Sequence, residues 1–262
     1  MKIENYMKKV FLTMMIAIAA IGASAADMPK QGFGVQIGWA QPILRLNTPS
    51  NPINAKDSLS QNVRLNGFKV GLVYDGSIVA GFGSSIGLNY TFGASNGGWR
   101  STNPAYGEYP KRRQLITYQE LELYVDWQYK FEIAKETYLM LYTGPTLQCG
   151  LTFTMRQDMK TEDFSGEITT TYGERFNAYK ADASNTEPDI RGFIEADNAF
   201  RRFNVTWGVG AGFQYKRYFL RGGYDFGLLV PYKNVDFANG YHTRGRLDQW
   251  NIKLGVYLWY RE

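Results

Sequence analysis

The sequence predicts an all-β fold: an eight-stranded antiparallel up-and-down transmembrane β-barrel. Three observations predict it, namely an export signal, side chains that alternate with period two, and links that alternate between long and short. The composition agrees, because a mean hydropathy of -0.34 excludes a protein with several membrane-spanning helices. A 16% content of aromatic residues excludes a disordered chain.

Residues 1–25 have the layout of a secretory signal peptide. Lys2, Lys8 and Lys9 precede an uncharged apolar run over 10–21, and Ala23-Ser24-Ala25 supplies small residues for cleavage after Ala25 or Ala26. The alternative is a single transmembrane anchor, but the apolar run is shorter than the ~18 residues that a span needs. We therefore expect an exported protein in the cell outer membrane, and the weak basicity of an exported chain predicts no nucleic-acid partner.

Eight stretches alternate large apolar residues with small or polar ones, as strands with two different faces do. In 250–260 the apolar positions include Trp250, Ile252, Leu254 and Val256, with Asn251 and Lys253 between them. Val63 and Leu65 are out of phase with the strand that follows them, which predicts a bulge near Gly67. The eight predicted strands are 31–40, 62–74, 79–92, 113–131, 137–151, 200–215, 218–230 and 247–260.

The glycines decide which face is inside. In a water-soluble sandwich or barrel the charged face meets water, whereas in a transmembrane barrel the apolar face meets lipid and the polar face fills the lumen. Glycines recur on the polar face, at positions such as 87, 208, 210, 212 and 255. Repeated glycines are not expected on a water-exposed strand face. They are expected in a narrow lumen, because small residues leave room for long side chains to cross the lumen.

The predicted links alternate in length without exception. Links 75–78, 132–136 and 216–217 are short, as periplasmic turns are. The domain from 26 to 262 is therefore a barrel with long extracellular loops over 41–61, 93–112, 152–199 and 231–246. The alternative is a soluble exported barrel or sandwich, which has no reason to sort its loops by length.

The signal peptide, the eight amphipathic strands and the final Val256-Tyr257-Leu258-Trp259-Tyr260 resemble small outer-membrane barrels of the OmpA/OmpX type. The Tyr-rich strands and long polar loops are most similar to PorT-like barrels of Bacteroidota-type bacteria. The first resemblance implies partnership with the barrel-assembly machinery. The second implies an accessory outer-membrane role in a protein secretion machine.

Charged residues on the polar face predict a lumen network that fills the barrel, because eight strands leave an interior that side chains just fill. The alternative is a gated polar path. The predicted network is Lys69, Glu120, Glu122, Asp126, Lys130, Arg202, Arg221, Asp225 and Lys253. Aromatic girdles are expected where lipid meets water; their predicted members are Trp39, Tyr74, Phe92, Tyr129, Tyr138, Phe203, Tyr215, Tyr218, Trp250 and Tyr260.

Catalysis is not predicted. A lipid A-modifying barrel enzyme is the alternative, but the only histidine, His242, lies in a predicted loop without the His-x-Ser spacing of one such deacylase family. Glu120 and Glu122 share a strand face, yet a filled lumen denies the open cleft that glycosidase chemistry needs. The lone Cys149 and the absence of a Cys/His cluster predict no metal and no cofactor.

Function is therefore expected in the loops, as a contribution to envelope integrity or as contact with a surface or secretion-system protein. Loop 152–199 is acidic, whereas Arg100, Lys111, Arg112 and Arg113 make the second loop basic. These opposite charges predict that the two loops dock, or that the basic residues hold phosphates of lipopolysaccharide. Residues 168–172 are expected to form a strand above the membrane with an edge for partners.

Overall fold

The fold is described from a computed structural model, which describes residues 31–47, 63–79, 81–101, 110–179, 200–230 and 244–261. The predicted signal peptide and His242 lie outside the described residues. All the elements in the described ranges are β-strands. No helix in this part of the chain is long and apolar enough to cross a membrane.

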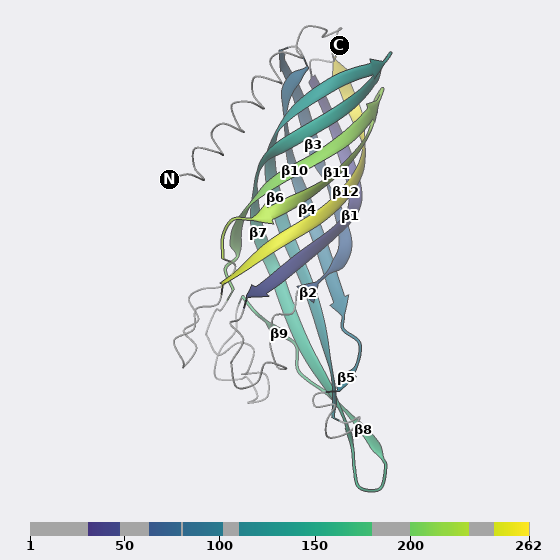
Figure 1. The fold of residues 1–262 in the computed structure, drawn as a ribbon, viewed down its shortest axis with the longest axis vertical. Helices are drawn as coiled ribbons and strands as arrows, with labels where there is room; N and C mark the ends of the chain where they lie inside the picture. The colour runs from purple at the N-terminus through teal and green to yellow at the C-terminus, as the bar shows by residue number, and fades with distance from the viewer. Residues whose placement is uncertain are drawn as a thin grey trace, which may run out of the picture.

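Eight long strands form the framework, and four short strands extend it (Figure 1). The long strands are β1 (Gln31–Asn47), β3 (Asn66–Val79), β4 (Phe82–Asn96), β6 (Lys111–Ala134), β7 (Thr137–Glu162), β10 (Phe203–Tyr215), β11 (Tyr218–Gly227) and β12 (Arg244–Arg261). The short strands are β2 (Val63–Arg64), β5 (Arg100–Ser101), β8 (Ile168–Tyr172) and β9 (Phe176–Asn177).

The eight long strands close into an antiparallel up-and-down barrel, which confirms the predicted fold. Each pairs with the next long strand along the chain, and β1 closes the ring by pairing with β12 from Gln31↔Arg261 to Asn47↔Arg244. Three tight turns join β3 to β4, β6 to β7 and β10 to β11, at the end of the barrel where β1 begins and β12 ends. Closure removes the sheet edges that an open eight-stranded sheet would expose.

Several predicted boundaries need correction. The first turn does not lie at 75–78, because β3 runs through Asp75 to Val79, and Gly81 just before β4 has a φ of 83°. The predicted loops 41–61, 93–112, 152–199 and 231–246 all begin or end inside strands, because pairing continues beyond the apolar belt; β7, for example, reaches Glu162. The predicted bulge near Gly67 is wrong: Ala40↔Gly67 and Ile43↔Arg64 continue one register, and Val63 and Leu65 simply face inward.

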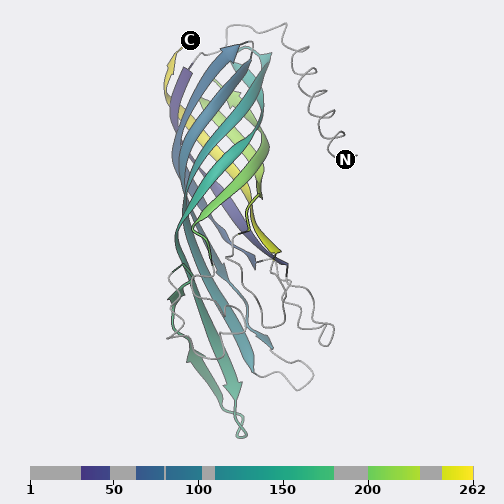
Figure 2. The ribbon, with the colours of Figure 1, turned by 90° about the vertical axis from the view of Figure 1, so that its left-hand side faces the viewer.

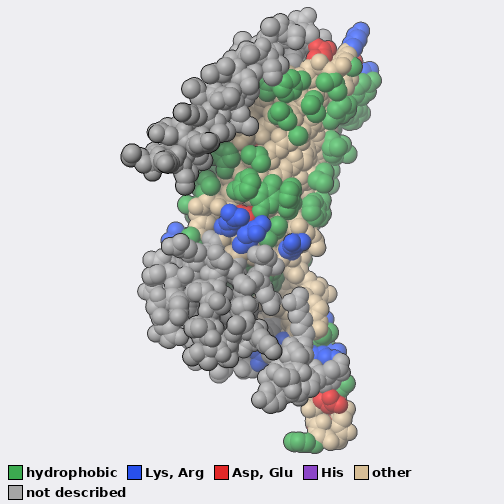
Figure 3. Space-filling model, in the orientation of Figure 1, with side chains coloured by type: hydrophobic (Ala, Val, Ile, Leu, Met, Phe, Trp, Pro, Cys, Tyr) green, Lys and Arg blue, Asp and Glu red, His purple; other side chains and the backbone are tan. Residues whose placement is uncertain are grey.

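The two faces of the barrel are inverted relative to a water-soluble protein. Aliphatic side chains such as Ile37 (60%) and Leu254 (56%) are exposed on the outside, whereas Lys69 (2%) and Arg221 (0%) are buried inside. Figure 3 shows apolar side chains gathered over the visible face of the barrel portion of the molecule. Successive strand residues point to opposite faces, so the period-two pattern of the sequence produces both surfaces at once.

Strands β6 and β7 continue past the barrel as a long two-stranded extension, which we call the hairpin and which Figure 2 shows from the side; its tip is the β7–β8 turn at residues 163–167, whereas the β6–β7 turn lies at the opposite end of the barrel. β7 leaves β10 after Cys149 and then pairs with β6 up to Lys160. Residues 150–162 add roughly 40 Å of strand at about 3.3 Å per residue. The predicted strand over 168–172 is present as β8, which pairs with β7 near the end of this hairpin.

Candidate functional site

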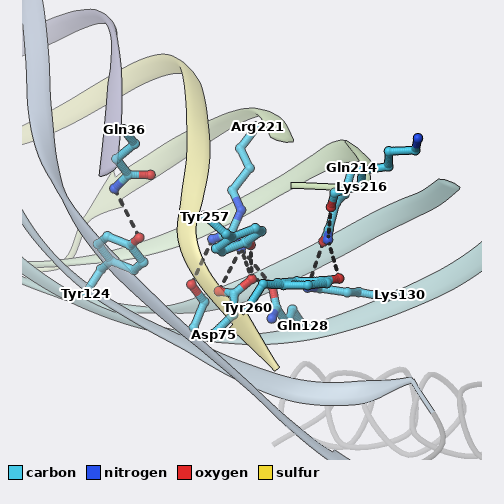
Figure 4. Close-up of polar contacts among 11 residues, drawn as sticks. Gln36, Asp75, Tyr124, Gln128, Lys130, Gln214, Lys216, Arg221, Tyr257 and Tyr260 are labelled. Atoms are coloured by element: carbon cyan, nitrogen blue, oxygen red, sulfur yellow. Dashed lines mark hydrogen bonds and ion pairs between the residues drawn. The ribbon is translucent and has the colours of Figure 1, made fainter. Parts of the chain in front are cut away.

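Arg221 on β11 is the centre of a buried network near the turn end of the barrel (Figure 4). Its Nη2 donates to both carboxylate oxygens of Asp75 on β3 and to Oε1 of Gln128 on β6, each at 3.0 Å. Its Nη1 donates to Ser85 Oγ at 2.9 Å. Lys130 Nζ lies 3.1 Å from the same Asp75 carboxylate, so one carboxylate pairs with two cations.

Polar side chains from β10 and β12 complete this network. The Tyr257 hydroxyl donates to Asp75, and Lys130 Nζ donates to Gln214 Oε1 at 2.9 Å. Gln214 Nε2 donates in turn to the Tyr260 hydroxyl at 2.8 Å. These contacts join β3, β4, β6, β10, β11 and β12 through the interior of the barrel (Figure 4).

A second network lies nearer the hairpin end and is built on Lys69 and Glu122. The Lys69 Nζ is 2.6 Å from Glu122 Oε2, and both side chains are buried. Thr91 Oγ1 and Gln249 Nε2 each donate to Glu122 Oε1 at 2.9 Å. Gln249 Nε2 also lies 3.3 Å from Glu120 Oε1, so the two glutamates share one amide donor. Glu122 is thus paired with one cation and accepts hydrogen bonds from the uncharged side chains of Thr91 and Gln249.

Asp126, Asp225 and Lys253 lie between these networks, around a cavity of about 10 Å³. No ion pair within 4 Å joins Lys253 to either carboxylate in the described part of the chain; its Nζ lies over the Tyr124 ring, 4.7 Å from the centroid. Asn251 Nδ2 donates to Asp225 at 2.9 Å. A cavity of this size holds about one water molecule. Its other lining residues are Lys69, Asn89, Glu122, Tyr124, Tyr142, Thr146 and Asn251.

Glycines make the room that these side chains occupy. A Cβ on Gly87 would overlap the ring of Tyr124, and a Cβ on Gly255 would overlap the ring of Phe219. Both rings lie inside the barrel and are almost fully buried. The glycines of the polar face therefore leave the space that aromatic side chains occupy in the interior.

The structure places eight of the nine predicted network residues in the interior, and Arg202 is the exception. Arg202 precedes β10, where its Nη1 contacts the carbonyl oxygens of Gly150 and Leu151 and its guanidinium lies over the Tyr179 ring. The prediction failed because β10 begins only at Phe203. Asp75, which is central to the interior, was missed because it was assigned to a turn, although it has the inward parity of β3.

The predicted girdle also needs two corrections. Tyr138 shares the inward parity of β7 with Met140, so it is only 5% exposed. Tyr260 turns inward to Gln214 because the β1–β12 register shifts at Leu258 and gives the outward position to Trp259. The other predicted girdle residues are exposed or partly buried: Trp39, Tyr74, Phe92, Tyr129, Phe203, Tyr215, Tyr218 and Trp250.

An apolar cluster caps the polar interior at the hairpin end. A register shift between β6 and β7 at Gln119/Glu120 changes the inward positions of β7, which brings Phe153 and Met155 inside. The Phe153 ring packs edge-on against Phe200, with the ring centroids 4.7 Å apart. The cluster consists of Leu44, Leu65, Ile116, Tyr118, Phe153, Met155, Ala178, Tyr179, Phe200 and Leu247.

The opposite face of the hairpin is charged. Arg113 Nη2 on β6 donates to Asp158 on β7 at 2.6 Å, and Arg156 contacts the same carboxylate at 3.0 Å. The Trp99 ring lies between Arg113 and Lys160, whose charged groups are 4.8 and 4.6 Å from its centroid. Arg113 and Asp158, which the prediction assigned to two docking loops, are instead directly paired residues of the adjacent strands β6 and β7.

Among the described residues, no group of three or more His, Cys, Asp or Glu side chains is arranged to hold a metal ion. No protein-family model and no curated protein matches the chain.

The comparison with solved structures gives weak matches. Ail, the attachment invasion locus protein of Yersinia pestis, is 12% identical with a TM-score of 0.36, over 87% of this chain and 99% of that chain. Neisserial surface protein A is 13% identical with a TM-score of 0.34, over 87% and 97% of the two chains. At these TM-scores neither likeness carries an argument about this chain, whose fold rests on its own strand pairing.

Proposed function

We propose that this chain is a non-enzymatic outer-membrane β-barrel with a filled interior, which acts at the cell surface through the β6–β7 hairpin. The observation that carries the membrane location is the inversion of the two faces: exposed aliphatic side chains surround buried Lys, Arg, Asp and Glu. In water this arrangement exposes a large apolar surface, whereas in a bilayer the same surface meets hydrocarbon.

The contacts inside the barrel support a filled interior. The network around Asp75, the network around Glu122 and the apolar cluster around Phe153 succeed one another along the barrel. The cavity between the two polar networks has room for about one water molecule. A continuous ion path through these layers requires charged side chains to leave their partners, which costs several kcal/mol for each buried charge.

Surface contact is assigned to the hairpin because it carries an unpaired strand edge. β8 pairs with β7 on one side and ends the sheet of the described strands on the other. Phe164 near the tip is fully exposed, and Ile168 and Tyr172 on β8 are exposed as well. An exposed edge with apolar side chains is suited to accept an extended segment of a partner protein.

Labelling of intact cells tests both the membrane location of the protein and the side of the membrane on which the hairpin lies. In a Cys149→Ala background, Ser165→Cys at the hairpin tip is expected to react with a membrane-impermeant maleimide, whereas Lys135→Cys in the β6–β7 turn reacts only after permeabilisation. The protein is also expected in the outer-membrane fraction, with a gel mobility that changes on heating. A soluble protein with unchanged mobility would overturn the proposed membrane location.

The surface role is tested by copurification in mild detergent. Phe164→Ser with Ile168→Ser is expected to lose a partner that the wild-type chain retains, while Ile133→Ser at the opposite end keeps it. Capture of secretion-system components through this edge would support the accessory role that the PorT-like resemblance implies. Equal capture by all three chains would contradict a role for the β8 edge.

A further inference from the structure

We propose that Arg45, Arg64 and Arg246 form a binding site for the phosphate group of a membrane lipid, on the outer wall of the barrel where β1, β2 and β12 meet. This site goes beyond the proposed surface role, because it lies on the barrel wall at the edge of the apolar belt and not on the hairpin. Figure 3 shows Lys and Arg side chains gathered just below the apolar zone on this side of the molecule.

The three arginines share one outward-facing patch. Arg45 and Arg246 are directly paired across β1 and β12, and Arg64 is paired with Ile43, two residues from Arg45. All three point away from the interior, since their chain neighbours Leu44, Leu65 and Leu247 face the buried apolar cluster. Arg64 is exposed, and the side chains of Arg45 and Arg246 are 39% and 48% exposed.

Asp248 orients the patch without neutralising it. Its buried carboxylate lies 2.5 Å from Arg45 Nε and 3.0 Å from Arg246 Nε. The Tyr224 hydroxyl donates to it at 2.7 Å, and the Gly227 backbone N–H donates at 3.0 Å. Four donors thus hold one carboxylate, and three arginines against one aspartate leave a net charge of +2. Arg45 Nη2 also donates to the Tyr224 hydroxyl at 3.0 Å. The remaining N–H groups of the two guanidinium groups, which are held in place through Nε, can donate to a second oxyanion in a geometry that suits a phosphate.

The height of the patch identifies the source of the phosphate. Asp248 and Arg246 lie two and four residues beyond Trp250, which faces outward and packs against Tyr224. At about 3.3 Å per residue and a strand tilt of about 35–45°, they lie roughly 5 and 10 Å above that indole. Interfacial tryptophan marks the edge of the hydrocarbon, and lipid headgroups occupy about the next 5–7 Å. The Nε atoms of Arg45 and Arg246 both contact the Asp248 carboxylate, so their guanidinium groups reach back toward the level of about 5 Å and lie at headgroup depth. We therefore commit to a lipid phosphate and not to a free anion.

The experiment measures lipid retention by native mass spectrometry of the full chain released from nanodiscs. The nanodiscs contain phosphatidylcholine with about 10–20% of either phosphatidic acid or diacylglycerol. We expect the wild-type chain to retain phosphatidic acid, and Arg45→Gln with Arg246→Gln to retain roughly tenfold less, since charge-assisted bonds to the phosphate are lost. Lys216→Gln with Arg217→Gln removes the same charge at the turn end and is expected to change nothing.

A heat-dependent gel shift reports whether each variant is folded. If the double variant does not fold, Arg64→Gln replaces it, because Arg64 is exposed and lies outside the Asp248 contacts; a loss of about threefold is expected. Equal retention of phosphatidic acid and diacylglycerol, or no loss in the arginine variants, would overturn the site. Competition by millimolar inorganic phosphate as effective as that by the lipid would overturn the choice of a lipid. None of these results bears on whether the hairpin binds a partner.

Discussion

Arg221 Nη2 on β11 donates to both carboxylate oxygens of Asp75 on β3, 3.0 Å from each, and the two residues are 146 positions apart in the sequence. The two strands are not neighbours in the sheet, because β1 and β12 lie between them. The ion pair is therefore a brace across the interior and not a contact along the wall. Its loss is expected to weaken the barrel as a whole.

Asp75→Asn is the first test of this brace. The substitution leaves Arg221 and Lys130 buried with no anion between them, and breaking a buried pair in this way costs about 3–5 kcal/mol. The free energy of unfolding, measured by urea titration in detergent micelles or lipid vesicles, is expected to fall by that amount. Asp163→Asn in the exposed hairpin tip serves as the control. A loss below about 1 kcal/mol would show that the pair has no bracing role.

The close fit of glycines beneath aromatic rings gives a second prediction. Gly255→Val places a branched side chain against the Phe219 ring, and such overpacking costs about 1–3 kcal/mol. Gly222→Val is the matched control: a Cβ there has only the Asn251 carbonyl oxygen near it, at 3.9 Å. Urea unfolding should therefore separate the two variants, and equal destabilisation would mean that backbone freedom, not interior space, selects glycine.

The strand content and closure of the barrel were predictable because each strand meets lipid on one face and a narrow interior on the other. Period-two alternation records that difference directly, so β12 could be recognised from Trp250, Ile252 and Leu254 alone. Interior charges such as Lys69 and Lys253 followed from the same parity. The alternation shows which side chains face the interior but not which of them contact one another. No pairing across the interior could therefore be derived from it.

The sequence prediction failed where contacts between residues far apart in the sequence outweigh a local sequence signal. Asp75 and Gly76 suggest a turn, but Arg221 and Lys130 stabilise the carboxylate inside the barrel and the strand continues to Val79. At Leu258 the register shift is invisible in the sequence, because the residues around it are all large and apolar. Tyr260 was therefore assigned to the wrong face.

Lys253 tests whether the interior is filled or gated. Lys253→Ala removes the cation that faces Asp126 and Asp225 across the small cavity, and the loss of this compensation is expected to cost about 1–3 kcal/mol. Conductance in planar bilayers is expected to stay at baseline, because the Asp75 network and the Phe153 cluster still fill the barrel on either side. Lys216→Ala in an exposed turn is the control for both measurements. A large steady conductance from the wild-type protein would contradict the filled interior.

The charged face of the hairpin gives a prediction about pH. Burial alone raises the pKa of Asp158, but hydrogen bonds from Arg113 and Arg156 outweigh it and leave the pKa below the ordinary value of 3.8. A carboxylate with a lowered pKa stabilises the folded hairpin fully above that ordinary value and loses this effect as the pH falls through the folded value. Protection of the hairpin amides from hydrogen exchange, corrected for intrinsic rates, is therefore expected to be constant from pH 7 to about pH 5 and to decline below about pH 4.

Asp158→Asn separates this ion pair from general acid effects. Since Arg113 and Arg156 are about a quarter exposed, their contribution is screened and amounts to about 1 kcal/mol, or roughly fivefold in protection. The variant is expected to show the reduced protection already at pH 7 and no further decline between pH 5 and pH 3. Glu174→Gln, on the same connection but exposed, is expected to follow the wild-type profile. A decline of equal size in Asp158→Asn would assign the acid sensitivity to other carboxylates. The hairpin would then be stabilised mainly by the apolar cluster around Phe153.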